Sequence, residues 1–193
     1  MELVLAAWAA LLVYIATNVD DLVVVATQLA LAEPPRHRGI LRGQRAAFYG
    51  VVATSLLLGN ALRVIPTAAF GLLAVVPLIS GLRGLWHLRS AELRDQGPVV
   101  APATGFVTSF LVTIALSGDN LAVYIPLLRA ASAGVTAVTL VVFVLANIAM
   151  LSACRWLAMH PAVVGRVRRA SPYLLPFVLI GLAAYVAVDT GLI

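Results

Sequence analysis

Charged side chains are scarce in this 193-residue chain. They make up 11% of the residues, whereas hydrophobic residues make up 62%. Soluble domains are about 25% charged, so the chain has too few charges to cover the surface of a water-soluble globule. The high hydrophobic content equally excludes a disordered chain. The composition therefore indicates a protein that lies in a lipid bilayer.

Cysteine is almost absent as well, since Cys154 is the single one in the sequence. One cysteine excludes an intrachain disulfide, a Cys-x-x-Cys redox pair and a cysteine-rich metal cage. Thiol chemistry is thereby excluded as the basis of the function. A metal ion bound by this chain would have oxygen or nitrogen ligands.

Long apolar runs, in contrast, are abundant. Runs of about the 17–25 residues needed to cross a bilayer occupy residues 3–32, 46–62, 64–82, 104–128, 130–154 and 173–193. They are continuous rather than alternating, which favours helices over the strands of a β-barrel. The first run has no basic segment before it and exceeds the apolar core of a secretory signal, so we expect it to be retained. We predict an all-α membrane protein of six transmembrane helices, with residues 1–193 forming one domain.

Lysine is missing altogether, and all 13 basic residues are arginines. With the N-terminus outside, the arginines divide 11 to 2 between inner and outer segments, and Arg63 and Arg129 are the two outside. A bias of this size orients a membrane protein, so both termini should be extracytoplasmic. The net charge of +5 then reflects topology rather than a nucleic-acid surface. Four of the inner arginines are expected before the second helix or at its inner entrance: Arg36, Arg38, Arg42 and Arg45.

The chain also repeats itself weakly. Segment 18–24 (NVDDLVV) aligns with segment 117–123 (SGDNLAV) at an offset of 99 residues, and Pro77 aligns with Pro176 at the same offset. Each half, about 1–95 and about 100–193, then holds three helices. An odd number of helices inserts the second half upside down relative to the first. This is the inverted-repeat plan of many secondary transporters.

Three acids lie deep within the apolar runs. Asp20 and Asp21 fall near the middle of the first predicted helix, and Asp119 falls near the middle of the fourth. An ionised aspartate at the bilayer centre costs about 2.5–3.5 kcal/mol even on insertion scales, so the acids need compensating partners. At about 100° per residue, polar residues share one half of each helix: Tyr14, Thr17, Asn18, Asp20, Asp21 and Gln28 on the first, and Ser109, Thr113, Ser117, Asp119, Asn120 and Tyr124 on the fourth.

If these two polar faces meet, they form an oxygen-rich site that suits a divalent cation. Gly118 and Pro126 should let the fourth helix open locally and expose backbone carbonyl groups. The alternative is that the acids are protonated and only hold helices together. We assign as metal ligands Thr17, Asn18, Asp20, Asp21, Ser117, Asp119 and Asn120, with Gln44, Asn60, Tyr124 and Asn147 as candidates for additional ligands.

Several motifs of this sequence, taken together, are typical of one known family. They are Ala16-Thr17 followed by Asp20, Gly43-Gln44 at the start of the second helix, Gly71-Leu72-Leu73 with Pro77 and Gly81, and Ser117-Gly118-Asp119-Asn120 followed by Pro126. With them the chain resembles the cadmium-resistance transporters of the CadD type, in the LysE exporter superfamily, over essentially its full length. The resemblance implies a six-helix exporter of divalent cadmium in the bacterial cytoplasmic membrane, with Asp20, Asp119 and Asn120 at its core.

The chain departs from the family pattern at its candidate site. Some relatives have a cysteine beside the fourth-helix motif, where this chain has Ser117 and Gly118, and Asp21 is an additional acid. Carboxylate and carbonyl oxygens suit Mn²⁺, Mg²⁺ or Ca²⁺, with Zn²⁺ and Cd²⁺ tolerated. The identity of the metal therefore stays open at this point.

These observations predict a secondary exporter that exchanges a divalent cation for protons on the same carboxylates. No G-x-x-x-x-G-K-[ST] motif occurs, so transport should use a gradient rather than ATP. Asp21, which the repeat pairs with Asn120, is expected to hold a proton that the arriving cation expels. We expect no enzymatic activity, no cofactor and no nucleic-acid partner. The expected partners are the cation and membrane lipid, and formation of a homo-oligomer is left open.

Two alternatives remain. One is export of a small amphipathic solute such as an amino acid, with Asp20 or Asp119 binding its ammonium group; the lack of an intramembrane arginine to receive the carboxylate argues against it. The other is an intramembrane aspartyl protease, in which two aspartates act as an acid and base pair. Ser117-Gly118-Asp119 lacks the first glycine of the Gly-x-Gly-Asp pattern of those enzymes.

Overall fold

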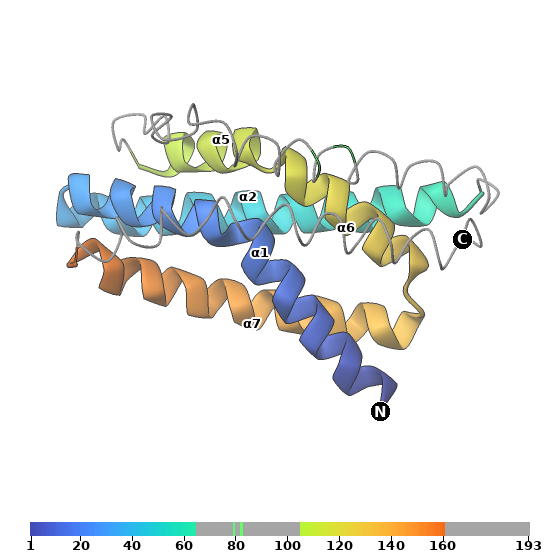
Figure 1. Cartoon of the computed structure of the whole chain (residues 1–193). Coiled ribbons are helices and arrows are strands. Elements are labelled where there is room, and N and C mark those ends of the chain that lie inside the picture. Colours follow the sequence, from blue (N-terminus) through green and yellow to red (C-terminus); the bar gives the residue numbers. More distant parts are fainter. Residues whose placement is uncertain (65–78, 80–81, 83–104, 161–193) are drawn as a thin grey trace.

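The computed structural model describes residues 1–64, 79, 82 and 105–160, and this part of the chain is helical (Figure 1). It contains no strand, which confirms the predicted all-α class for the described ranges. The predicted sixth helix and nearly all of the third lie outside the described residues. The elements are α1 (Glu2–Leu31), α2 (Pro34–Ala61), the short 3-10 helix η1 (Leu62–Val64), α5 (Phe106–Leu116), α6 (Gly118–Ala130) and α7 (Ala133–Ala158).

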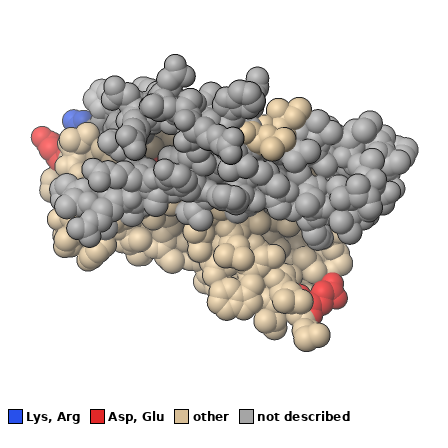
Figure 2. Space-filling model, in the orientation of Figure 1, with Lys and Arg blue, Asp and Glu red and all other residues tan. Residues whose placement is uncertain are grey.

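Three of these stretches are long and apolar enough to cross a membrane: α1, α2 together with η1, and α7. Helices α5 and α6, which are bent by 64° relative to each other, are long and apolar enough to make a fourth if the pair counts as one span. On the face shown in Figure 2, charged side chains of the described surface lie only toward its two ends. Between these ends the described surface of this face carries no charged side chain, which suits the hydrocarbon part of a bilayer.

The bend between α5 and α6 lies at Ser117, directly before Gly118. The sequence predicted a local opening of the fourth helix here, and the structure has one. Pro126 lies inside α6 without ending it. The break gives α6 an N-terminus in the middle of the span, with Asp119 in its first turn.

Helix α2 begins earlier than the sequence analysis expected. It starts at Pro34, about nine residues before the expected opening at Gly43-Gln44. Arg36, Arg38, Arg42 and Arg45 therefore lie on its first turns. Proline is favoured at the first helical positions because its missing N–H has no partner there in any case. The search for apolar runs missed this start because the opening turns of α2 are rich in arginine.

The helices pack in two groups. Helix α1 packs mainly against α7, and α2 packs mainly against α5 and α6. Glycines let α2 approach its neighbours closely: a Cβ atom on Gly43 would collide with the carbonyl oxygen of Phe106, and one on Gly59 would lie 3.1 Å from that of Ile125. Backbone contact of this kind is typical of helices that associate within membranes.

A prediction follows for Gly43. We expect Gly43→Ala to separate α2 from α5 and to lower stability by about 1–3 kcal/mol, the usual cost of overpacking, seen as earlier loss of the monodisperse peak on heating in detergent. Gly50→Ala is the matched control, because no atom of the described residues lies within 4 Å of a Cβ atom at Gly50. Equal melting of the two variants would show that the contact at Gly43 is not tight.

The helix boundaries repeat at the offset found in the sequence. Helices α1 and α6 end at Leu31 and Ala130, which are 99 residues apart, and α2 and α7 begin at Pro34 and Ala133, again 99 apart. The same offset relates α1 to the α5–α6 pair and α2 to α7. The α1–α7 group and the α2–α5–α6 group therefore each contain the first span of one half of the chain and the second span of the other half.

Aromatic rings join the two groups at the centre. The Tyr14 ring on α1 lies 5.4 Å from Phe48 on α2 and 5.9 Å from Phe143 on α7, between ring centroids. Tyr124 on α6 lies 4.7 Å from Phe143. All four side chains are buried, so this aromatic core fixes the level at which α1, α2, α6 and α7 meet.

Candidate functional site

Polar side chains from α1, α2, α6 and α7 are buried beside the aromatic core. We call them the central polar cluster, and each is 3% exposed or less. Burying so many polar groups in an apolar bundle is costly unless they find partners or bind a ligand. The cluster consists of Tyr14, Thr17, Asn18, Asp21, Gln44, Asn120, Tyr124 and Asn147.

Hydrogen bonds join α1 to α6 within the cluster. The Asn18 Nδ2 donates to the Tyr124 Oη at 2.7 Å, and the Thr17 hydroxyl shares a hydrogen bond of 2.9 Å with the same Oη. The polar faces of the first and fourth predicted helices therefore meet. Asn120 lies one turn before Tyr124 on α6, and Asp21 lies about one turn beyond Asn18 on α1.

A second set of hydrogen bonds extends the cluster to α2 and α7. The Asn147 Nδ2 donates to the Gln44 Oε1 and to the Tyr14 Oη, both at 3.3 Å. The Tyr14 hydroxyl in turn donates to the sulfur of Met150 at 3.4 Å. Because the Tyr14 carbonyl also accepts from the Asn18 Nδ2 at 2.9 Å, the bonds form a continuous path from α2 through α7 and α1 to α6.

Several oxygens of the cluster remain without a hydrogen-bond partner among the described residues. They are the Oδ1 atoms of Asn18, Asn120 and Asn147 and the Oδ2 atom of Asp21, all buried. The Asn18 Nδ2 faces Tyr14, Thr17 and Tyr124, which turns its oxygen away from them. A buried acceptor without a donor costs about 1–3 kcal/mol. Oxygens in this state are the ligands that a divalent cation takes from a protein.

The three acids lie near one another. Asp21 is buried, whereas Asp20 and Asp119 are half-buried. The Asp21 carboxyl interacts electrostatically with those of Asp20 and Asp119, and Asp20 and Asp119 also interact with each other. The Asp119 Oδ1 accepts a hydrogen bond of 2.9 Å from the backbone N–H of Asn120, at the positive end of α6.

The acids do not converge on one point. In the described part of the chain, no three carboxylate, imidazole or thiol groups lie close enough together to hold one metal ion. The three carboxylates are thus electrostatic neighbours rather than a ligand triad in this conformation. A cation bound here would need the amide and hydroxyl oxygens of the cluster as well, or a movement of α1 relative to α6.

One residue assigned from the sequence, Asn60, lies apart from the cluster. Ser117 is buried at the break between α5 and α6, one turn before Asn120, and its hydroxyl donates to the carbonyl of Thr113 at 2.6 Å. Asn60 is exposed near the end of α2, where its Nδ2 donates to the carbonyl of Leu56. The structure adds Tyr14 as the link between α1 and α7. Its place on the polar face of the first helix was the signal that pointed to it.

The family of the chain can now be stated. Residues 14–193 match the family described as cadmium resistance transporter. The chain belongs to that family. The match begins at Tyr14, so it contains every residue of the central polar cluster, and it confirms the resemblance noted from the motifs. No curated protein and no solved structure matches the chain.

Membership in the cadmium resistance transporter family agrees with the fold. The helices that are long and apolar enough to span a membrane fit a membrane transport protein. The family also indicates that the substrate is a metal ion. The cluster contains amide and carboxylate oxygens that have no hydrogen-bond partner among the described residues, which is compatible with such a substrate.

Proposed function

We propose that this protein is a secondary-active exporter of a divalent metal cation, cadmium or a related ion, in the bacterial cytoplasmic membrane. The cation binds at the central polar cluster and is exchanged for protons on the aspartates. The observation that carries the proposal is a set of buried oxygens from α1, α6 and α7 that have no hydrogen-bond partner in the described part of the chain. Together with three neighbouring carboxylates, they offer both the charge and the ligand atoms that a divalent cation needs.

The ligand set follows from where these oxygens lie. We assign to it the oxygens of Asn18 and Asp21 on α1 and of Asn120 on α6, with the carboxylates of Asp20 and Asp119 beside them. Thr17 and Tyr124 hold the Asn18 amide so that its oxygen, not its nitrogen, is available to the cation. Ser117 adds a hydroxyl group at the break of the fourth span. Asn147 and Gln44 close the cluster on the side of α2 and α7.

Proton exchange follows from the same charges. Three ionised carboxylates close together in a bundle would repel one another and carry the cost of burial in an apolar environment. The empty site therefore holds at least one proton, and an arriving cation displaces it because ligands must be deprotonated to bind. Asp21 is the buried member of the three and interacts with both others, so we assign the exchanged proton to Asp21.

Alternating exposure of the site would use the two groups of helices. We propose that they are related by an inverted repeat, which the matching helix boundaries at an offset of 99 residues support. The central polar cluster lies between the α1–α7 group and the α2–α5–α6 group. Rocking of one group against the other about a fixed midplane site is the usual mechanism of transporters built in this way.

The experiment that tests this function uses the purified protein in proteoliposomes. Uptake of Cd²⁺, Zn²⁺ and Mn²⁺ is followed with an enclosed metal-sensitive dye, with and without an imposed pH gradient. We expect at least one of these cations to be transported and its rate to rise when protons can flow in the opposite direction. Transport that is absent for all divalent cations, or insensitive to the pH gradient, would contradict the proposal.

The orientation gives a separate prediction. The arginines divide 11 to 2, so the N-terminus should lie outside the cytoplasmic membrane. A cysteine introduced at Glu2 in a Cys154→Ser background should therefore react with a membrane-impermeant maleimide added to spheroplasts, whose cytoplasmic membrane is intact. A cysteine at Arg38, on the first turns of α2, is the matched control and should react only after the membrane is opened. The reverse pattern would place both termini in the cytoplasm.

A further inference from the structure

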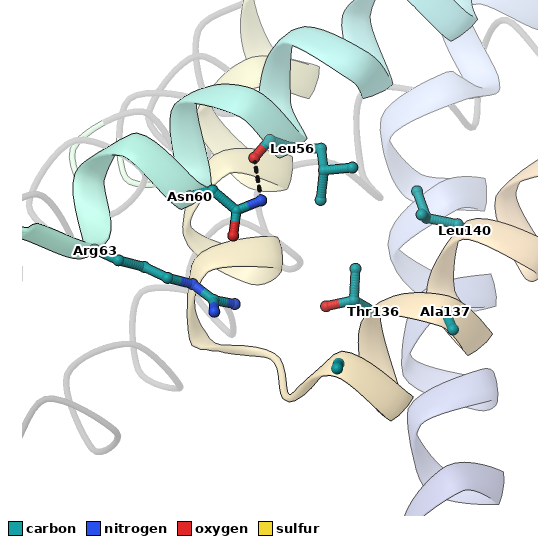
Figure 3. A pocket seen from close by; sticks show the side chains of 7 residues that line it. Leu56, Asn60, Arg63, Thr136, Ala137 and Leu140 are labelled. Atoms are coloured by element: carbon teal, nitrogen blue, oxygen red, sulfur yellow. Dashed lines mark hydrogen bonds between the residues drawn. The ribbon is translucent and has the colours of Figure 1, made fainter.

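A pocket of about 300 Å³ lies between the end of α2 and the beginning of α7. It is lined by Leu56, Asn60 and Arg63 on one side and by Thr136, Ala137 and Leu140 on the other (Figure 3). The pocket is distinct from the central polar cluster, because Asn60 lies about 24 Å beyond Gln44 along the axis of α2. Its volume is at the lower end of the range for small-molecule sites.

The pocket changes from polar to apolar with depth. Arg63 follows the end of α2 and Leu56 lies about 10 Å further back along the helix. Helix α7 shows the same order from its own end, with Thr136 before Leu140. The guanidinium, carboxamide and hydroxyl groups of Arg63, Asn60 and Thr136 extend into the space between the two helices (Figure 3), while leucines form the deeper part.

This gradient matches the level of the phosphate groups in a bilayer. Helix α2 has 28 residues and so extends about 42 Å, which exceeds the hydrocarbon thickness of about 30 Å. Its end, and with it Arg63, reaches the headgroup region. Leu56 and Leu140, about two turns deeper, then lie at the level where acyl chains begin. A ligand that fits has an anionic head and an apolar tail.

The charge of the pocket is positive. Arg63 is its one ionisable lining residue within the described part of the chain. Its Nη2 donates to the carbonyl of Ala131 at 3.1 Å, and a guanidinium has five N–H donors in a planar fork suited to phosphate. The Thr136 Oγ1, also in the lining, is buried and has no hydrogen-bond partner among the described residues. It can donate to an anion beside Arg63.

We propose that this pocket binds the phosphate headgroup of an anionic phospholipid. The phosphate lies against Arg63 and Thr136, and the first carbons of an acyl chain lie along Leu56 and Leu140. Inorganic phosphate shares the anionic chemistry but would leave the apolar part of the pocket without a partner. The proposal does not depend on the transported cation, because the pocket is separate from the central polar cluster.

The chain offers a matched control for Arg63. Arg63 donates to the carbonyl of Ala131, the residue that caps the C-terminus of α6. Arg129 donates through its Nε, at 3.2 Å, to the carbonyl of Leu62, the residue that caps the C-terminus of α2. Each arginine thus satisfies a carbonyl group at the end of the other helix, which is a favourable position for a cation. Both lose such a bond when replaced, but Arg63 lines the pocket and Arg129 is not among its lining residues.

The test is native mass spectrometry of the purified protein with added dioleoyl phosphatidylglycerol or dioleoyl phosphatidylcholine. Both lipids carry a phosphate that Arg63 can contact, but the choline cation of the zwitterionic lipid offsets the charge of its phosphate. We therefore expect the wild type to retain the anionic lipid about tenfold better than the zwitterionic one. Arg63→Ala and the pocket-filling Ala137→Phe should abolish this preference. Arg129→Ala should keep it within about twofold of the wild type.

The Ala137 variant and a competition with inorganic phosphate complete the test. Ala137→Phe retains Arg63 and both capping bonds, so it tests the pocket even if Arg63→Ala does not fold. Inorganic phosphate at millimolar concentration should not displace the lipid, and displacement would overturn the lipid assignment in favour of a free-anion site. Equal retention of the two lipids by the wild type would overturn the proposal, as would equal loss in the Arg63 and Arg129 variants, which would trace the effect to the helix ends.

Discussion

Asp20→Asn and Asp119→Asn should each reduce cation transport at least about tenfold while the protein still inserts and folds. Each substitution removes one charge from a group of three carboxylates that interact electrostatically. A charged contact to a buried partner is worth about 1.5–3 kcal/mol, and every 1.4 kcal/mol is a factor of ten. Transport in proteoliposomes and the monodispersity of the detergent-solubilised protein measure the two parts of this prediction.

The structure explains why stability should survive these substitutions. Asparagine has the size of aspartate and keeps one acceptor oxygen, so the hydrogen bond from the Asn120 N–H to residue 119 can persist. Neutral side chains are also less costly within a membrane. Glu33→Gln is the matched control, because Glu33 is an acid at the N-cap of α2, outside the cluster. Normal transport by Asp20→Asn or Asp119→Asn would show that the carboxylate at that position is not needed for cation transport and that the side chain only packs between helices.

The polar faces of the first and fourth spans were predictable because helical periodicity is a local property. A period of 3.6 residues places Thr17, Asn18 and Asp21 on one face whatever surrounds the helix, and the same holds for Asn120 and Tyr124. The break before Gly118 was also predictable, because glycine and a mid-helix polar segment weaken the helix at one point. The structure shows both features.

The partners of these faces were not predictable from spacing alone. That Asn147 donates to both Gln44 and Tyr14 depends on how α2, α7 and α1 pack, which periodicity within one helix does not fix. Asn60 had the same sequence signal as Asn147, a lone amide in an apolar run. It nevertheless lies near the end of α2 and lines the pocket between α2 and α7. The start of α2 was missed for another reason: its proline signal at Pro34 was present, but arginines hid the helix from a search for apolar runs.

The arginines show how one residue type serves two structural purposes. We expect those on the first turns of α2 to orient the chain through their number, with long side chains that can reach the headgroup region. Arg63 and Arg129 lie against the predicted bias, and the structure gives each a specific partner, a carbonyl group at the end of the other's helix. On this proposal, charge serves orientation at one end of the bundle and helix capping at the other.

The expected result for Asp21→Asn differs from that for the other acids: the variant should bind the cation about tenfold more weakly and release about one proton fewer per cation bound. Asp21 is the buried acid of the three and lies near both others, and we assign the exchanged proton to it. Calorimetry in buffers of different ionisation enthalpy measures the protons released. The sign of the pH effect follows, since cation binding should weaken as the pH falls, and less so in the variant than in the wild type.

The repeat supplies a sharper version of the experiment. Asp21 aligns with Asn120 in the repeat. Both side chains have a buried oxygen without a partner in the described part of the structure. The double variant Asp21→Asn/Asn120→Asp therefore moves the third carboxylate to the equivalent place on α6. If the number of carboxylates sets proton release, the double variant should restore it. If only the surroundings of Asp21 hold the proton, release should stay low in the double variant. Unchanged proton release in the single variant would rule Asp21 out as the exchanging group and assign the exchange to Asp20 and Asp119.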